Sequence, residues 1–211
     1  MMETTEAFAP RFPGRSAAIL SGGKSSRMGA NKALLEVGGS SMLRRTAGLL
    51  RPLVDDLFIV ADDPAPYADL GLAVVADVHR GCGALGGIHA AIARAAHPLV
   101  LCAACDMPHI NGGVLEVLLG TARPDDDALI PRSGGFPEPL LAVYGRGALP
   151  AIEQAILAGR LKITGALGGL RVRFVDEEAL APVDPERRCF INVNTPAELT
   201  EARGRATGER P

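Results

Sequence analysis

The chain has 211 residues, 47% of them apolar, and its 22 basic and 24 acidic residues give a formal net charge of −2. This length fits one domain with a large core that needs no disulfide or structural metal. High apolar content with low net charge excludes a disordered chain, and the near-neutral balance argues against a general nucleic-acid binder. Uninterrupted apolar runs long enough to span a membrane are absent, and residues 1–13 lack the pattern of a secretory signal. We therefore expect a cytoplasmic protein with no membrane contact.

The first half of the chain alternates predicted strands and helices. Continuous apolar runs predict strands at 15–20, 57–61, 72–76 and 99–104. Helical spacing of apolar residues predicts helices at 40–50, 88–96 and 114–119. Strands that are apolar throughout, joined by helices, are typical of a parallel sheet buried on both faces. The sequence therefore predicts a three-layer α/β domain with a mostly parallel sheet.

The second half continues with shorter elements. A strand is predicted at 128–131, an apolar run follows at 140–144, and then come a helix at 149–157 and strands at 171–175 and 190–193. Thr195 and Pro196 open a terminal helix, as N-cap and first helical residue. We expect a single domain over residues 15–203, with residues 1–14 and 204–211 as flexible ends.

In sheets of this kind the ligand lies at the carboxyl ends of the strands. Glycines and polar residues follow the predicted strands at 21–32, 62–63, 77–87, 105–108 and 192–194. The first of these segments is a glycine-rich loop with Lys24, Arg27 and Lys32. Its glycines allow close backbone approach and its cations add positive charge, so the loop suits a polyphosphate.

Three kinds of phosphate-binding loop are candidates for this segment. A Walker A loop requires glycine where this chain has Ala18, and the glycine spacing also differs from a dinucleotide fingerprint. The third kind is the loop of a nucleotidyltransferase. In that interpretation Arg27 neutralises the phosphates of a nucleoside triphosphate, and Lys32 reaches the phosphate being transferred.

Four motifs in order resemble the molybdenum cofactor guanylyltransferases, the MobA-like nucleotidyltransferases. They are LSGGKSSRMGANKALL from Leu20, GALGG at 83–87, CDMP at 105–108 and INVNTP at 191–196. The resemblance implies a Rossmann-like nucleotidyltransferase fold. It also implies transfer of GMP from GTP to molybdopterin, with Mg²⁺ as cofactor and pyrophosphate as the second product. It leaves open transient contact with proteins that mature molybdoenzymes.

The resemblance also assigns roles to individual residues. It implies that Arg27, Lys32 and Asp106 are catalytic and that Asp106 holds the magnesium ion. The nucleotide-binding residues that it implies are Leu20, Ser21, Gly22, Gly23, Lys32, Asp77 and Asp106. Two positions depart from the family pattern, since Asn31 precedes the signature lysine in place of Asp and Ala61 follows the second strand in place of Asn.

Asn192 and Asn194 alternate along the predicted last strand and are candidate ligands for the acceptor. Their amides suit a pterin or a phosphate, but asparagine before Thr-Pro is also common turn chemistry. Both interpretations stay open at this point.

Alternatives to guanylyl transfer remain. The same chemistry with CTP, or a non-catalytic carrier of molybdopterin or nucleotide, would use a similar loop. A redox protein would use Cys102 and Cys105, although these two thiols fit a buried strand better. The four histidines show no metal-ligand spacing and are expected to be structural or on the surface.

Overall fold

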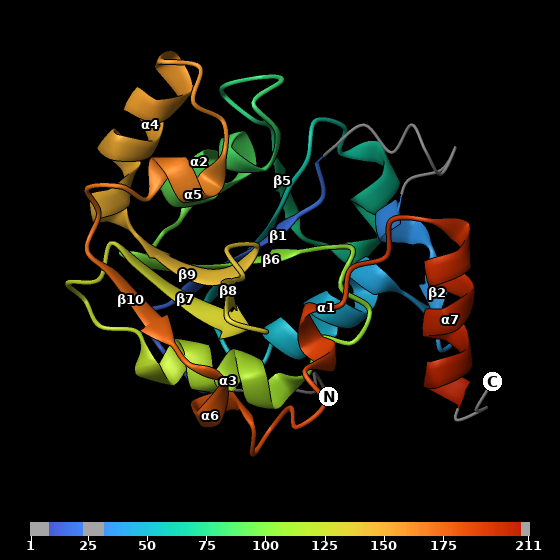
Figure 1. Cartoon of the computed structure of the whole chain (residues 1–211). Coiled ribbons are helices and arrows are strands. Elements are labelled where there is room, and N and C mark those ends of the chain that lie inside the picture. The colour runs from blue at the N-terminus through green and yellow to red at the C-terminus, as the bar shows by residue number, and fades with distance from the viewer. Residues whose placement is uncertain (1–8, 23–31, 208–211) are drawn as a thin grey trace, which may run out of the picture.

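A mixed sheet lies between two layers of helices in the computed structural model, which describes residues 9–22 and 32–207 (Figure 1). The strand order is β10-β7-β9-β6-β1-β4-β5, with β8 paired to β7. Strands β5, β4, β1 and β6 run parallel, whereas β9 is antiparallel to both of its neighbours. The strands are β1 Ser16–Leu20, β4 Asp56–Val60, β5 Ala73–Val75, β6 Leu99–Ala104, β7 Ala128–Ser133, β8 Phe136–Pro137, β9 Leu141–Gly145 and β10 Val172–Val175.

Helices cover both faces of this sheet. In Figure 1, α2, α4 and α5 lie on one face and α1, α3 and α6 on the other. The predicted three-layer, mostly parallel α/β architecture is therefore confirmed. The helices are α1 Met42–Leu50, α2 Gly83–Arg94, α3 Gly112–Thr121, α4 Leu149–Leu157, α5 Ile163–Ala166, α6 Glu177–Leu180 and α7 Pro196–Thr207, with 3-10 turns η1 Lys32–Leu34, η2 Ala65–Leu70, η3 Arg146–Ala148 and η4 Arg188–Phe190. Among the helices of the described ranges, none is long and apolar enough to cross a membrane.

The central strand β1 is buried on both faces, and this burial explains why its residues are all apolar or small. Ala17 and Ile19 belong to the core beneath α1 and α3, and Ala18 and Leu20 to the core beneath α2 and α4. Successive side chains of a strand point to opposite faces, so a strand between two helix layers has no solvent-facing side. The continuous apolar run at 15–20 follows from this burial.

A small third core attaches the C-terminal helix to the rest. Val37 lies in a two-stranded hairpin, β2 Glu36–Val37 and β3 Ser40–Ser41, and shares this core with Met42 of α1 and Leu199 of α7. Arg203 adds a hydrogen bond, in which its Nε donates to the carbonyl of Glu36 over 2.8 Å. The C-terminal helix is thereby anchored close to η1, which carries Lys32.

Three helix starts differ from the sequence prediction. Helix α3 begins at Gly112, two residues earlier than expected. Helix α1 begins at Met42, because Ser40–Ser41 pairs as a strand and the Ser41 hydroxyl accepts the backbone N–H of Arg44 as an N-cap. Helix α2 begins at Gly83 and includes the glycines expected to precede it. Gly86 and Gly87 are buried there, so close packing outweighs their low helix propensity.

The prediction of a strand at 190–193 is wrong. Residues 188–190 form the turn η4, since Arg187 takes a left-handed conformation with φ 53° and Asp184 accepts the backbone N–H groups of Arg188 and Cys189. The start of α7 is as predicted, with Thr195 as N-cap and Pro196 as the first helical residue, and Glu198 completes a capping box. The Thr195 hydroxyl accepts the N–H of Glu198, whose carboxylate accepts the N–H of Thr195.

We predict that Gly145→Ala destabilises the fold by roughly 3 kcal/mol, because overpacking against rigid backbone forces the chain to shift. A Cβ at Gly145, the last residue of β9, would lie 2.1 Å from the carbonyl oxygen of Asp126. The matched control is Gly48→Ala on α1, where a Cβ meets nothing within 4 Å. That variant should gain about 1 kcal/mol from helix propensity. Urea unfolding of both proteins measures the difference, and equal stabilities would contradict it.

Candidate active site

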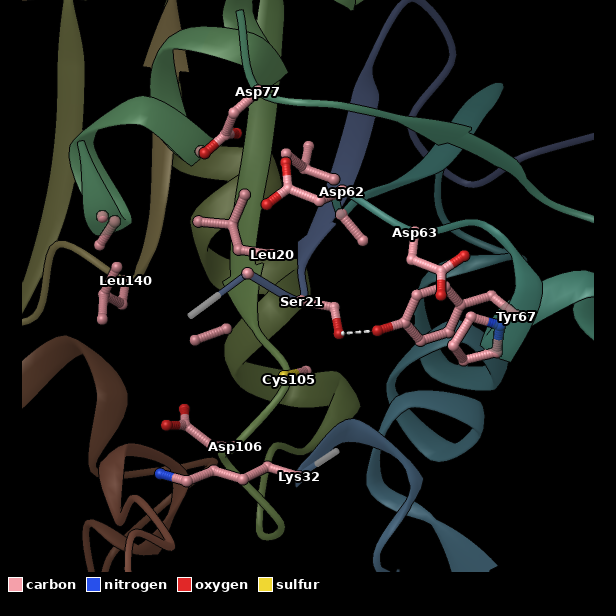
Figure 2. Close-up of a pocket in the computed structure, with 18 of the residues that line it drawn as sticks. Leu20, Ser21, Lys32, Asp62, Asp63, Tyr67, Asp77, Cys105, Asp106 and Leu140 are labelled. Atoms are coloured by element: carbon pink, nitrogen blue, oxygen red, sulfur yellow. Dashed lines mark hydrogen bonds between the residues drawn. The ribbon is translucent and has the colours of Figure 1, made fainter. Parts of the chain in front are cut away.

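A cavity of about 930 Å³ opens at the carboxyl ends of β1, β4, β5 and β6 (Figure 2). Backbone hydrogen bonds continue the sheet for one residue beyond these strands. The N–H of Ser21 donates to Val60, and the N–H of Cys105 donates to Leu20. The strand ends therefore lie level with one another. The described residues that line the cavity are Leu20, Ser21, Gly22, Lys32, Val60, Ala61, Asp62, Asp63, Pro66, Tyr67, Asp77, Gly81, Gly83, Ala84, Gly87, Ala104, Cys105, Asp106 and Leu140.

The structure brings together most of the residues predicted to bind nucleotide. Six of them line this one cavity, although they come from four separate segments: Leu20, Ser21, Gly22, Lys32, Asp77 and Asp106. Gly23 and Arg27, and the departure at Asn31, lie outside the described residues. The departure at Ala61 is a small side chain on the cavity wall, next to Asp62.

Asp106 is a mostly buried carboxylate at the end of β6. Its Oδ1 atom is buried and has no hydrogen-bond partner within the described ranges. Burial raises the pKa of its carboxyl group above the usual range, and the positive charge of Lys32 offsets part of that rise. A partly desolvated carboxylate with one unpartnered oxygen at a cavity fits a cation bound there.

Asp77 is a second carboxylate on the wall, after β5. Its Oδ1 atom is also buried without a partner among the described residues. Burial raises its pKa, and the neighbouring carboxylate of Asp62 raises it further, while His79 acts in the opposite direction. Helix α2 packs tightly against it, since a Cβ on Gly86 would lie 3.1 Å from Asp77 Oδ2. Gly86 therefore lets α2 approach this aspartate.

Positive potential comes from two sources. The amino-terminal turn of α2 faces the cavity through Gly83, Ala84 and Gly87, and Cys82 makes no side-chain cap there. Helix N-termini attract anions. Lys32 adds a full charge at the other end, close to Asp106 (Figure 2). A cation held by Asp106 would add to the positive charge of Lys32 and of the helix N-terminus. Positive charge from these three sources suits a polyphosphate.

The cysteine pair does not have the chemistry of a redox site. Cys102 is fully buried on β6, and burial strongly raises the pKa of its thiol. Burial, together with the charge of Asp106, raises the pKa of Cys105 to about 12. Because the thiolate is the reactive form, neither thiol is activated. The interpretation as residues of a buried strand is confirmed for Cys102.

The family of the chain is settled by comparison with known proteins. The family model described as MobA-like NTP transferase domain matches residues 17–171. The chain belongs to this family. It is 41% identical to a probable molybdenum cofactor guanylyltransferase of Pelotomaculum thermopropionicum, over 91% of this chain and 93% of that protein. The molybdenum cofactor guanylyltransferase of Desulfosudis oleivorans is 36% identical, with 87% and 92% covered.

A solved structure agrees with both relatives. Molybdopterin-guanine dinucleotide biosynthesis protein A from Archaeoglobus fulgidus superposes with a TM-score of 0.79 at 32% identity, covering 92% of this chain and 99% of that one. The resemblance noted from the four motifs is thus confirmed. The protein is a MobA-like NTP transferase, and hence an enzyme that transfers nucleotidyl groups.

Three contacts of this MobA-like transferase were not expected from its sequence. The hydroxyl groups of Tyr67 and Ser21 share a hydrogen bond of 2.7 Å at the cavity wall (Figure 2). Tyr67 lies on η2, in a segment without a pattern that indicates a ligand site. The Lys32 ammonium donates to Asn194 Oδ1 over 2.7 Å, and the N–H of Val193 donates to the carbonyl of Asp106. The segment before α7 thereby orients the lysine.

We predict that Asn194→Ala lowers catalytic efficiency about tenfold, the effect of losing one hydrogen bond to a charged group. The loss should shrink when Lys32 is already Met, because Asn194 then has no lysine to orient. Steady-state kinetics of the two single variants and the double variant form the cycle. Equal losses in both backgrounds would contradict a positioning role, and Thr200→Ala on α7 is a control that touches neither residue.

Proposed function

We propose that the chain transfers GMP from GTP to molybdopterin, releasing pyrophosphate and forming molybdopterin guanine dinucleotide. The observation that carries this proposal is the buried, unpartnered Oδ1 atom of Asp106, beside Lys32 at one end of the cavity. The guanylyltransferase names of relatives at 41% and 36% identity support guanine as the base. Their names also support a molybdenum cofactor precursor as the acceptor.

The reaction places several anions in one site. A phosphate of the acceptor must attack the α-phosphorus of the triphosphate while pyrophosphate leaves. The protein therefore has to align the reacting groups and balance their charge. Lys32 would neutralise the phosphate being transferred, and Arg27 is proposed to do the same for the phosphates next to it. The N-terminus of α2 adds partial positive charge from the opposite wall.

We assign Mg²⁺ to Asp106. Magnesium prefers oxygen ligands and commonly binds through one or two carboxylates together with substrate phosphates. The unpartnered Oδ1 of Asp106 fits this donor type. When held by Asp106, the ion would stabilise the negative charge that develops on the phosphates.

The remaining roles are proposed from the resemblance to the family and, for Leu20, Ser21, Gly22 and Asp77, from their place in the cavity lining. Leu20, Ser21 and Gly22, with Gly23 in the loop beyond them, would hold the base and sugar of GTP, and Asp77 would face them across the cavity. Asn192 is proposed for the acceptor, because its Oδ1 is buried with no partner in the described part of the chain. Asn194 would contribute there alongside its bond to Lys32. Since GTP is a cytoplasmic metabolite, we propose the cytoplasm as the location.

We predict selective thermal stabilisation by GTP with Mg²⁺ when GTP, CTP, ATP and UTP are compared. A ligand that binds only the folded state adds about 2.7 kcal/mol of stability at a hundredfold excess over its Kd. The shift should shrink without Mg²⁺. A CTP-selective shift would instead support cytidylyl transfer, and equal shifts with all four nucleotides would contradict guanine selectivity.

We predict that Asp106→Asn lowers kcat on the order of 10³-fold, because the metal's charge stabilisation is worth several kcal/mol. Asp63→Asn is the matched control. Asp63 lines the same cavity but caps the N–H of Ala65, and its loss should change kcat by no more than about threefold. Product formation is measured by chromatography with saturating GTP. GTP binding without product in the first variant excludes the carrier alternative, whereas unchanged product would contradict the role of Asp106.

A further inference from the structure

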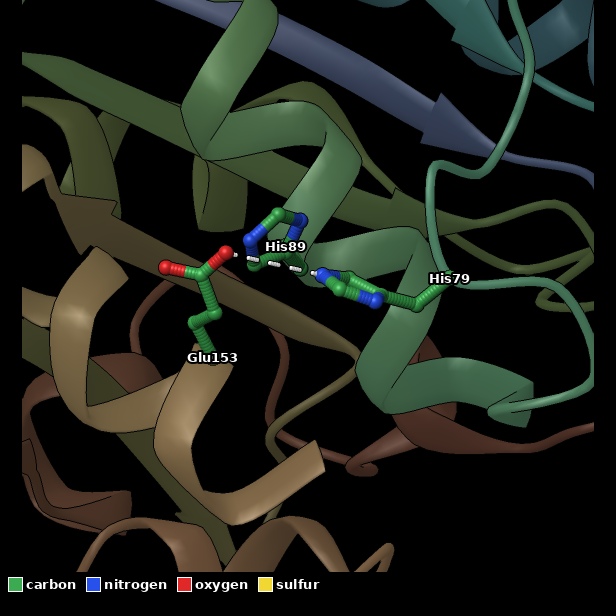
Figure 3. A group of neighbouring side chains, drawn as sticks. All are labelled: His79, His89 and Glu153. Atoms are coloured by element: carbon green, nitrogen blue, oxygen red, sulfur yellow. Dashed lines mark ion pairs between the residues drawn. The ribbon is translucent and has the colours of Figure 1, made fainter. Parts of the chain in front are cut away.

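Two histidines and a glutamate converge outside the nucleotide cavity (Figure 3). His79 lies in the loop between β5 and α2, His89 on α2 and Glu153 on α4, and their side chains point toward one another. The imidazole rings meet edge to face with centroids 4.7 Å apart. His79 Nε2 lies 3.8 Å from Glu153 Oε1, and one potential ligand atom from each of the three residues lies within 4.8 Å of the others.

The burial of these rings leaves nitrogen atoms without partners. His89 is only 5% exposed. Its Nδ1 atom and Nε2 of His79 are both buried and make no hydrogen bond within the described residues. A buried polar atom without a partner costs free energy, and a native protein normally satisfies it with water, protein or an ion. Packing alone would not leave two such nitrogens in one cluster.

The donor set selects a particular class of ion. Two imidazoles and one carboxylate are ligands of zinc and similar divalent transition metals, with a fourth position open to water. Magnesium prefers oxygen donors and is therefore disfavoured here. Burial and the neighbouring His79 lower the pKa of His89, which favours the neutral form that a metal ligand requires.

We propose that His79, His89 and Glu153 bind one zinc-type divalent cation at a site separate from the nucleotide cavity. Tetrahedral zinc places its ligand atoms about 3.4 Å apart. The donors must therefore draw inward by about an ångström. Glu153 has the freedom to do so because its side chain is half exposed.

The position of the site gives the ion a structural role. His79 is two residues from Asp77, and His89 is two residues from Gly87, both on the wall of the nucleotide cavity. A bound ion would link the loop after β5 to α2 and α4. It would restrain the wall that carries Asp77 without contacting the nucleotide.

The test titrates the purified full chain, made without a histidine tag, with Zn²⁺ in the presence of excess Mg²⁺ and a chromophoric chelator. One equivalent should bind to the unmodified protein and raise its melting temperature. Glu153→Gln and His89→Gln should weaken binding at least about 100-fold, since even the loss of a partner outside the ligand shell typically costs 10–100-fold. His97→Gln, a histidine paired with Asp55 elsewhere, should leave binding unchanged.

Two further readouts separate this site from other zinc contacts. Cobalt should give the visible spectrum of a nitrogen- and oxygen-bound ion, without the intense near-ultraviolet band of thiolate ligation. Binding that survives in Glu153→Gln would come from the thiols or the nucleotide cavity and would overturn the proposal. Absence of zinc binding in the unmodified protein would overturn it as well. Glu153 is half exposed, so its variant should fold even if His89→Gln does not.

Discussion

The parallel arrangement of β5, β4, β1 and β6 is the constraint on which the site depends. Parallel strands end at the same edge of a sheet, so the residues that follow them meet without being near in sequence. Ser21, Asp62, Asp77 and Asp106 reach one cavity for this reason. The apolar residues of the strands stabilise the sheet, and the residues immediately beyond them supply the chemistry.

Two carboxylates at the same edge of the sheet are destabilised in their charged form by burial. Asp77 and Asp106 both have raised pKa values, chiefly because burial disfavours their charged forms. Leaving an ionisable group partly desolvated and unpartnered lowers stability in the free protein. A bound cation and phosphates would relieve that cost. The desolvation cost that these carboxylates impose on the free protein would then favour ligand binding.

The sequence predicted the first half of the fold well because, there, local pattern and tertiary environment agree. Strand β6 was predicted with its observed bounds, since a strand buried on both faces must be apolar throughout. The run at 190–193 has similar composition but becomes η4 and irregular chain, because Asp184 and the left-handed Arg187 decide its backbone. In the site, the residues that belong to motifs directly after the strands could be predicted. Tyr67 could not, since only tertiary packing brings its hydroxyl to Ser21.

The histidine cluster shows the same limit and connects the two sites. His79 and His89 lack a ligand spacing because they lie on different elements, and Glu153 joins them only when α4 packs against α2. The loop after β5 carries both Asp77, which faces the cavity, and His79, which faces α4. A Cβ on Gly86 would lie 3.1 Å from both Asp77 Oδ2 and the carbonyl oxygen of His79, so the glycine lets α2 pack closely against this loop. A restraint on His79 therefore acts directly on the position of Asp77, because the segment between them has little room to move.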